Sequence, residues 1–243
     1  MAKITIVIST LNEEQYIKKL LVDILNSSYK NYEIIVSDNG SSDNTIMKVK
    51  SIKDWKKKIK IVQSKKKGPS CVRNYGARNL KSEYILFLDA DSRMDSFFLE
   101  NSIIEMEKRK LDIASYYIYS VNKRLFENIF IFFSNIISNI MQYITPISSA
   151  GILIKTKIHN KIKGFDENIT TVTENLDYLR RASKFGKFRI IKSSKDEFCF
   201  RRFQQEGKIK TAKKWVLGLF FHLLKIDLNK FPYEYKFGGF KNP

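Results

Sequence analysis

The feature that most constrains the fold is an alternation of short apolar runs and helical patterns, which continues as far as residue 89. Runs rich in β-branched and aromatic residues predict strands at 3–8, 32–37, 58–63 and 83–89. Apolar residues at helical spacing predict helices between them, at 13–27, 42–54 and 69–80. Repeated strand–helix units with apolar strands imply an α/β fold, in which a doubly wound, mostly parallel sheet is covered by helices on both faces.

The rest of the chain is less regular and shows no internal repeat. We expect a strand at 111–119, helices at 125–144 and 174–185, strands at 187–192 and 197–202, and a last helix at 208–226. The chain has 243 residues, of which 43% are hydrophobic. This is enough for one large domain, or for one domain with an appendage.

Polar residues stand where the predicted strands end. Thr10 follows the first strand, Asp38 the second, and Asp89 and Asp91 the fourth. Because ligands of such sheets bind beyond the C-terminal ends of the strands, we expect these side chains to converge on one rim. The alternative is turn chemistry, above all for Asp38 in "IVSDNGSSDN", since Asp, Asn and Gly are common turn formers.

Asp89 and Asp91 form an Asp-x-Asp pair directly after an apolar strand. Two carboxylates that flank one residue offer hard oxygen ligands to Mg²⁺ or Mn²⁺, and such a cation can bridge a substrate diphosphate. The tripeptide alone is a common occurrence, so its position after the strand gives it weight. We therefore expect both aspartates to be metal ligands.

The formal net charge of +19 indicates either anionic partners or a lysine-rich, solvated surface. The sequence has no nucleic-acid reader motif and no basic stretch interleaved with aromatics, so we expect no nucleic-acid partner. Cys71 and Cys199 provide neither a disulfide framework nor a clustered metal site, which favours a reducing compartment. A polar "LNEEQ" follows the first strand and no secretory signal is indicated, so we expect a cytoplasmic protein.

Several segments resemble the family 2 glycosyltransferases, in the same order and at roughly the same spacing. These are "IVISTLNEEQYI", "EIIVSDNGSSDNT", "GPSCVRNYGARNL", "YILFLDADS" and "GFDEN" followed by "TENLDYLRRASKFG". The resemblance covers residues 3 to about 192 and implies a GT-A fold. It implies a glycosyltransferase domain at 1–207, with a nucleotide-binding half at 1–92 and an acceptor-side half at 93–207. Residues 208–243 would form a C-terminal amphipathic helix and tail.

The resemblance also implies which residues hold the donor, a nucleoside diphosphate sugar. These are Thr10, Glu13, Asp38, Arg73, Asp89 and Asp91. The first three would contact the base and ribose, and the arginine would bond the diphosphate or orient an aspartate. The two last would hold the metal on the diphosphate, with Asp91 as the direct ligand and a catalytic residue.

The chain departs from the family pattern at Ser9, where a proline is usual, and at Asn39, where a second acid is usual. A larger departure is Asn175, because family members often have an aspartate there that deprotonates the acceptor hydroxyl for inverting transfer. An amide cannot act as this base. Glu174 or Asp177 can take over from the same helix N-terminus, and Glu174 is our first choice. Alternatively, the acceptor is already ionised, as a lipid phosphate is, or the activity has been lost.

Two predicted helices are candidates for contact with lipid. The helix at 125–144 has an apolar stripe of Leu125, Ile129, Phe132, Phe133, Ile136, Ile137, Ile140 and Ile144. Polar residues interrupt this helix too often for a bilayer span. "KKWVLGLFFHLLK" at 213–225 places aromatic and aliphatic residues between lysines, which is typical of a helix in a membrane interface. The alternative for both helices is core packing or dimer formation.

Arg201 and Arg202, in "CFRRFQQEGKIKT", resemble a pattern found near the end of some family members and are expected to contact a donor diphosphate or a lipid phosphate. The alternative is an exposed strand end. His159 has no partner at ligand spacing and is expected to be a surface helix residue, whereas His222 is expected to be packed or interfacial. Cys71 is expected to be a small packing residue.

These features together predict metal-dependent, inverting transfer of a sugar from a nucleoside diphosphate sugar to a lipid-linked or glycan acceptor, peripherally at the cytoplasmic face of a membrane. A nucleotidyltransferase would need a Gly-rich phosphate loop after the first strand, where "STLNEEQ" has no glycine. A nicotinamide dehydrogenase would need G-x-G-x-x-G at that place. A non-catalytic sugar-nucleotide or membrane-binding protein is compatible with Asn39 and Asn175.

Overall fold

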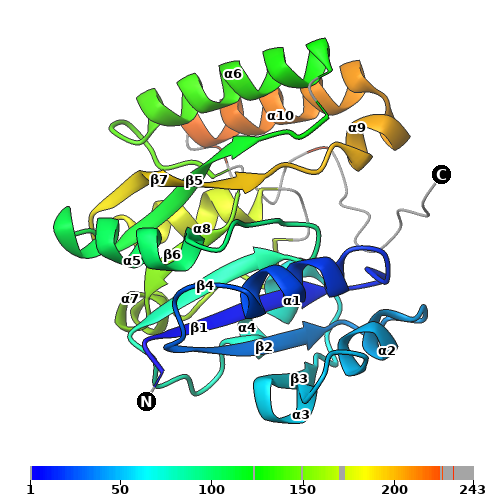
Figure 1. Ribbon diagram of the computed structural model, residues 1–243. Helices are drawn as coiled ribbons and strands as arrows, with labels where there is room; N and C mark the ends of the chain where they lie inside the picture. The colour runs from blue at the N-terminus through cyan, green and yellow to red at the C-terminus, as the bar shows by residue number, and fades with distance from the viewer. Residues whose placement is uncertain are drawn as a thin grey trace.

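A single seven-stranded sheet organises the chain. The computed structural model describes residues 2–122, 124–148, 150–169 and 173–224, together with residues 226 and 232. Within them the strand order is β3-β2-β1-β4-β6-β5-β7, and helices cover both faces of the sheet (Figure 1). The predicted α/β class is confirmed.

The N-terminal half of the sheet is parallel, as predicted. Its strands are β1 (Ile4–Thr10), β2 (Tyr32–Asp38), β3 (Ile59–Gln63) and β4 (Tyr84–Asp89). The helices between them are α1 (Ile17–Leu25), α2 (Thr45–Lys50), α3 (Trp55–Lys58) and α4 (Pro69–Gly76). β1 is buried along its whole length, since Ile6 faces one hydrophobic cluster and Val7 the other.

The C-terminal half is mixed. β6 (Ile152–Lys155) runs antiparallel to β4 and to β5 (Ile113–Tyr119), whereas β7 (Phe188–Glu197) runs parallel to β5. The helices of this half are α5 (Phe98–Lys108), α6 (Leu125–Met141), α7 (Thr156–Lys161), α8 (Glu174–Ala182), α9 (Arg201–Glu206) and α10 (Lys208–Leu223). We did not predict α5, β6, α7 or α9.

The predicted strand at 197–202 is wrong. β7 ends at Glu197, and the chain then turns into α9. Phe198, Phe200 and Phe203 do not alternate across the sheet but join an aromatic cluster, in which the Phe198 and Phe200 rings are 4.9 Å apart. The aromatic residues that suggested a strand therefore serve helix packing instead.

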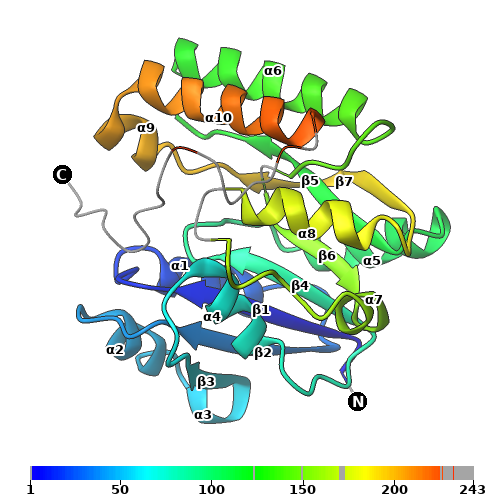
Figure 2. The same cartoon turned by 180° about the vertical axis from the view of Figure 1, so that it is seen from behind.

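α6 and α10 lie side by side at the end of the molecule remote from β1, β2 and β3 (Figures 1 and 2). The aromatic cluster holds them together, with the ring centroids of Phe130 and Trp215 5.5 Å apart. The polar face of α6 is turned inwards: the side chain of Asn135 both accepts from the backbone N–H of Ile118 and donates to its carbonyl. In the described part of the chain, no helix combines the length and apolarity of a membrane span.

The expectation that His159 lies on the surface is wrong. α7 packs against α8, so the His159 ring is buried, with Nδ1 2.8 Å from the hydroxyl of Tyr178. Burial, helped by the nearby Arg181 guanidinium, lowers the pKa of His159 to about 4. His222 is packed, as one expectation had it, with Nε2 2.8 Å from Thr145 Oγ1. Cys71 is also buried.

Candidate functional site

The ends of three neighbouring strands form one rim. In the parallel register Thr10 pairs with Asp38, and Ser9 pairs with Asp89. The carboxyl ends of β1, β2 and β4 therefore meet, as the sequence predicts. Asp91 follows two residues beyond the end of β4, so the acid pair also lies at this rim.

The Asp38 carboxylate is fully engaged by its own corner. Its Oδ2 accepts from the backbone N–H groups of Gly40 and Ser41, both at 2.9 Å. Its Oδ1 accepts from Thr10 Oγ1 at 3.0 Å and from Ser41 Oγ at 2.5 Å. Gly40 has φ +84°, which favours glycine. These contacts are those of the turn alternative, and the assignment of Thr10 and Asp38 to nucleotide binding stays a prediction.

Arg73 connects the acid pair to the start of α8. Its guanidinium donates to Asp89 Oδ1 at 2.8 Å and to Glu174 Oε1 at 2.9 Å. Burial opposes the charge of Arg73, but the two carboxylates outweigh this and raise its pKa. Desolvation likewise opposes ionisation of Asp89, yet the Arg73 guanidinium holds the pKa of that carboxyl below its usual value. At this point the site is a hydrogen-bonded bridge from Asp89 through Arg73 to Glu174.

A second arginine bridges the other acids. Arg201, at the start of α9, donates to both oxygens of Glu13, at 2.7 and 2.6 Å, and lies 3.2 Å from Asp91 Oδ2. Burial raises the pKa of Asp91 against the opposing charge of Arg201. Because Glu13 and Arg201 are far apart in sequence, this bridge ties the end of the domain to its first strand–helix connection.

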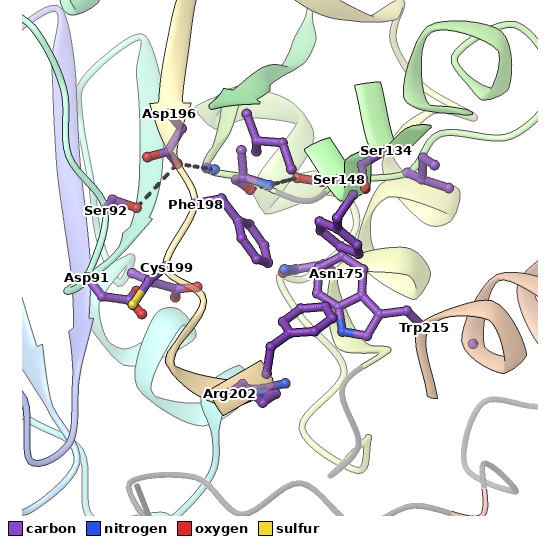
Figure 3. Close-up of a pocket in the computed structure, with 18 of the residues that line it drawn as sticks. Asp91, Ser92, Ser134, Ser148, Asn175, Asp196, Phe198, Cys199, Arg202 and Trp215 are labelled. Atoms are coloured by element: carbon purple, nitrogen blue, oxygen red, sulfur yellow. Dashed lines mark hydrogen bonds between the residues drawn. The ribbon is translucent and has the colours of Figure 1, made fainter. Parts of the chain in front are cut away.

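These residues line a cavity of about 550 Å³ (Figure 3). The predicted site residues in its wall are Glu13, Arg73, Asp89, Asp91, Glu174, Arg201 and Arg202. Thr10, Asp38 and Asp177 are not part of the wall formed by the described residues. The cavity therefore brings together all of the predicted diphosphate and metal positions and Glu13, but not Thr10 and Asp38, the other two residues predicted for the base and ribose.

Asp196 and Cys199 line the cavity but were not predicted as site residues. Asp196, near the end of β7, is buried, and its Oδ2 accepts from Ser92 Oγ at 3.3 Å and from the Gly151 N–H at 3.1 Å. Burial raises the pKa of Asp196 to about 7. Cys199 lies beside Asp91 (Figure 3), and burial raises the pKa of its thiol to about 12. Asp196 belongs to none of the sequence motifs described above, so the sequence offered no signal for it.

The start of α8 supplies the residues considered as base. Glu174 Oε1 is bound by Arg73, while Oε2 is buried and has no hydrogen-bond partner within the described residues. Asn175 also lines the cavity, and its buried Oδ1 is likewise without a partner there. Asp177 points to Arg181 at 2.6 Å and to Arg180 at 3.3 Å. Of the two candidate carboxylates, Glu174 alone reaches the cavity wall that the described residues form.

The family of the chain follows from a family model. The model described as glycosyl transferase family 2 matches residues 5–163, more than half of the chain. This chain is a family 2 glycosyltransferase. Its sheet and helices are those of the GT-A fold, as the resemblance implied, and it is an enzyme of the glycosyltransferase class. The nucleotidyltransferase alternative is therefore set aside.

Relatives of the glycosyltransferase are found among bacterial enzymes. It is 26% identical over 233 residues to glycosyltransferase GlyA of Streptococcus pneumoniae, an alignment that covers 89% of this chain and 33% of GlyA. It is 33% identical over 96 residues to the GalNAc(5)-diNAcBac-PP-undecaprenol beta-1,3-glucosyltransferase of Campylobacter jejuni, covering 39% of this chain and 31% of that enzyme. The chain thus spans about a third of the length of these relatives.

A solved structure shares the fold of the glycosyltransferase. Residues 1–349 of TarS from S. aureus, in a crystal structure with UDP-GlcNAc, superpose with a TM-score of 0.63 at 18% sequence identity. The match covers 81% of this chain and 59% of the TarS chain. At this level of identity the likeness is one of fold.

Asp89 and Asp91 offer the donor set expected for a divalent cation. Both are carboxylates at the same rim, and more than half of the Asp89 side chain is exposed to the cavity. Within the described residues, no group of three or more His, Cys, Asp or Glu side chains is arranged to hold a metal ion. A cation held by the two aspartates would need its remaining ligands from outside the protein, such as a diphosphate and water.

Proposed function

We propose that this glycosyltransferase transfers a sugar, with inversion, from a nucleoside diphosphate sugar to a lipid-linked or glycan acceptor at a membrane surface. One observation carries the donor half: the cavity unites the Asp89 and Asp91 carboxylates with the guanidinium groups of Arg73 and Arg201. Such a mixture of acids and bidentate cations suits a metal-bound diphosphate. The UDP-GlcNAc complex of TarS supports a uridine nucleotide as the first class to test.

In this proposal the carboxylates of Asp89 and Asp91 hold Mn²⁺ or Mg²⁺. The cation would neutralise charge on the departing diphosphate. Arg73 fixes Asp89 through the 2.8 Å contact, and Arg201 steadies Asp91 and Glu13. Thr10, Glu13 and Asp38 are proposed for the base and ribose, and Arg202, in the cavity wall, for a phosphate.

The acceptor half of the proposal depends on the start of α8. Glu174 could accept a proton on Oε2, which has no partner within the described residues, while Oε1 keeps the hydrogen bond from Arg73. Loss of the carboxylate charge would, however, weaken the charge-assisted bond that holds Arg73. Asp177 would have to leave two arginines and enter the cavity. An acceptor that is already ionised requires neither protonation of Glu174 nor movement of Asp177. The contacts therefore favour the second explanation for Asn175, an anionic acceptor such as a lipid phosphate.

The membrane surface is proposed from the exposed sides of α6 and α10. Large apolar residues are exposed on both helices, among them Phe132 and Ile140 on α6 and Phe220 on α10. Together they exceed what single scattered surface residues explain. Lysines on α10 add attraction to anionic headgroups. A peripheral position at the cytoplasmic face accords with these features.

The experiment that tests the proposed function is a thermal-shift and calorimetric screen of UDP-, GDP-, TDP- and CMP-sugars with and without Mn²⁺. We expect one nucleotide class to raise the melting temperature by about 5 °C or more at a hundredfold excess over Kd. Asp91→Asn should abolish this effect without lowering the melting temperature of the free protein. Asp54→Asn, an equal charge change at an exposed residue outside the cavity, is the matched control.

The donor, metal and inversion parts of the proposal can each fail separately, the last two in turnover assays. No stabilisation by any nucleotide sugar would contradict the assignment of the strand-end acids to the donor. Full turnover in the presence of a chelator would refute the metal assignment at Asp89 and Asp91. Retention of the donor's anomeric configuration in the product, read from NMR coupling constants, would refute inversion.

A further inference from the structure

The cavity has a second, apolar half that the proposed donor chemistry does not use. Beyond the acids and arginines its wall is formed mainly by aromatic and aliphatic side chains from α6 and α10, with Ser134 and Ser138 among them; the apolar members include Phe126, Ile129, Phe130, Phe133, Trp215 and Val216. Figure 3 shows Asp91 and Cys199 on one side of the cavity and Ser134 and Trp215 on the opposite side. A polar sugar nucleotide finds few partners for its hydroxyl groups along such a wall.

The apolar half is continuous with the outside of the molecule. Phe133 and Val216 line the cavity, and yet 56% and 69% of their surface is exposed. The exposed apolar side chains of α6 continue from Phe133 to Ile136 and Ile140. This exposure follows from the inward hydrogen bonds of Asn135 to β5, which turn the apolar stripe outwards. A hydrocarbon chain could therefore extend from the cavity along the exposed side of α6 and remain in contact with apolar side chains.

Cationic side chains mark the junction between the two halves. Arg201, Arg202 and Lys214 all line the cavity, and Trp215 begins the apolar wall directly after Lys214. Guanidinium groups bind phosphate through paired hydrogen bonds. Arg201 is held by Glu13 and Asp91, and Lys214 by Glu206, so these cations are fixed in the wall that also carries the apolar side chains. A cavity with both kinds of lining complements an amphiphile with an anionic head and a hydrocarbon chain.

We propose that the apolar half of the cavity, between α6 and α10, binds the hydrocarbon chain of a phosphate-bearing acceptor, with its head group at the arginines. This inference rests on the proposed function and narrows its acceptor to one chemical class. The apolar wall and its continuity with the outward apolar stripe of α6 support this occupant over a glycan, which has no hydrocarbon chain to follow that stripe.

The test is calorimetric binding of ethyl, butyl and octyl phosphate to the full chain in the presence of the nucleotide selected by the donor screen. Inorganic phosphate is the control for the head group alone. We expect affinity to rise by about threefold for each methylene that enters the cavity, which is slightly less than full transfer from water. Butyl phosphate should therefore bind at least tenfold more tightly than inorganic phosphate.

Two neighbouring phenylalanines provide matched variants. Phe133 lines the cavity and Phe132 does not, although 61% of Phe132 is exposed and the two rings touch, with centroids 5.6 Å apart. Phe133→Asn should weaken octyl phosphate binding by at least tenfold and leave inorganic phosphate unaffected. Phe132→Asn should leave the dependence on chain length unchanged. Because both side chains are largely exposed, both variants should keep the wild-type melting temperature.

Several outcomes would overturn the inference while leaving the proposed function intact. If the nucleotide still binds but inorganic phosphate and octyl phosphate bind with equal affinity, the site recognises only the anion and not the hydrocarbon chain. An equal loss of octyl phosphate affinity in Phe132→Asn and Phe133→Asn would mean that the hydrocarbon chain binds to the outer face of α6. A dimer in analytical ultracentrifugation that dissociates with Phe133→Asn would make a second copy the occupant. Failure of every nucleotide to bind would instead refute the proposed function itself, and this inference with it.

Discussion

Arg73→Met is expected to lower the free energy of unfolding by about 3 kcal/mol, near the lower end of the range for breaking a buried ion pair by removal of one partner. The magnitude follows from the burial of the two carboxylates that Arg73 holds. The side chains of Arg73 and Glu174 are each 7% exposed, so the substitution leaves Glu174 buried as an uncompensated charge. Asp89 is 57% exposed and can be rehydrated, so it adds little to the loss.

The measurement is urea unfolding at neutral pH, followed by tryptophan fluorescence. Arg78→Met is the matched control, because the Arg78 guanidinium is exposed over the Tyr75 ring and its loss should cost no more than about 0.5 kcal/mol. Arg73→Met combined with Glu174→Met should recover most of the loss, since an apolar pair of similar volume replaces the ion pair. Additive losses in the double variant, or equal losses for Arg73→Met and Arg78→Met, would refute the reasoning.

Three further predictions concern the rim and the core. Gly76→Ala would place a Cβ 2.6 Å from Val7 Cγ1, and we expect a loss of about 1–3 kcal/mol in urea unfolding; unchanged stability would mean that α4 can shift. The amide of Asp38→Asn can no longer accept all four hydrogen bonds of this corner, so the free energy of unfolding should fall by about 1–2 kcal/mol in the same assay. No loss would mean that water replaces these hydrogen bonds. Burial lowers the pKa of His159 from 6.5 to about 4, so the unfolded chain takes up the proton first and stability declines as the pH falls from 6.5 towards 4. His159→Gln should flatten this decline by up to about 1.4 kcal/mol per pH unit, and identical slopes in unfolding measurements would contradict a buried neutral imidazole.

The elements that the sequence predicted well are strands whose two faces are both buried, because burial of both faces makes the whole strand apolar. β1, β2 and β4 are continuous apolar runs because helices cover both faces, and their ends could be placed to within two residues. β6 has only four residues and runs antiparallel between longer strands, so its pattern is too short to distinguish from a loop. α9 was mistaken for a strand because aromatic residues favour strands unless tertiary packing uses them otherwise.

The site was predictable where it depends on strand ends and not where it depends on distant segments. The register of a parallel sheet requires the ends of β1 and β4 to be neighbours, so Asp89 could be placed at the rim. The bridge from Arg201 to Glu13 and Asp91 joins segments that no spacing relates. The place of Asp196 in the cavity could not be predicted for the same reason, because β7 is brought there by its pairing with β5.

Asn175 acquires a physical explanation from its neighbours rather than from its own side chain. A hydroxyl acceptor would require Glu174 to accept a proton, but Glu174 also supports Arg73, which in turn holds Asp89. Protonating Glu174 during each turnover would weaken the bridge that fixes the acid pair, so the two duties conflict. A phosphate acceptor removes the conflict, since its oxygen is already charged and needs only cations nearby. Arg201, Arg202 and the apolar wall beyond them would supply the cations and the chain site that such an acceptor needs.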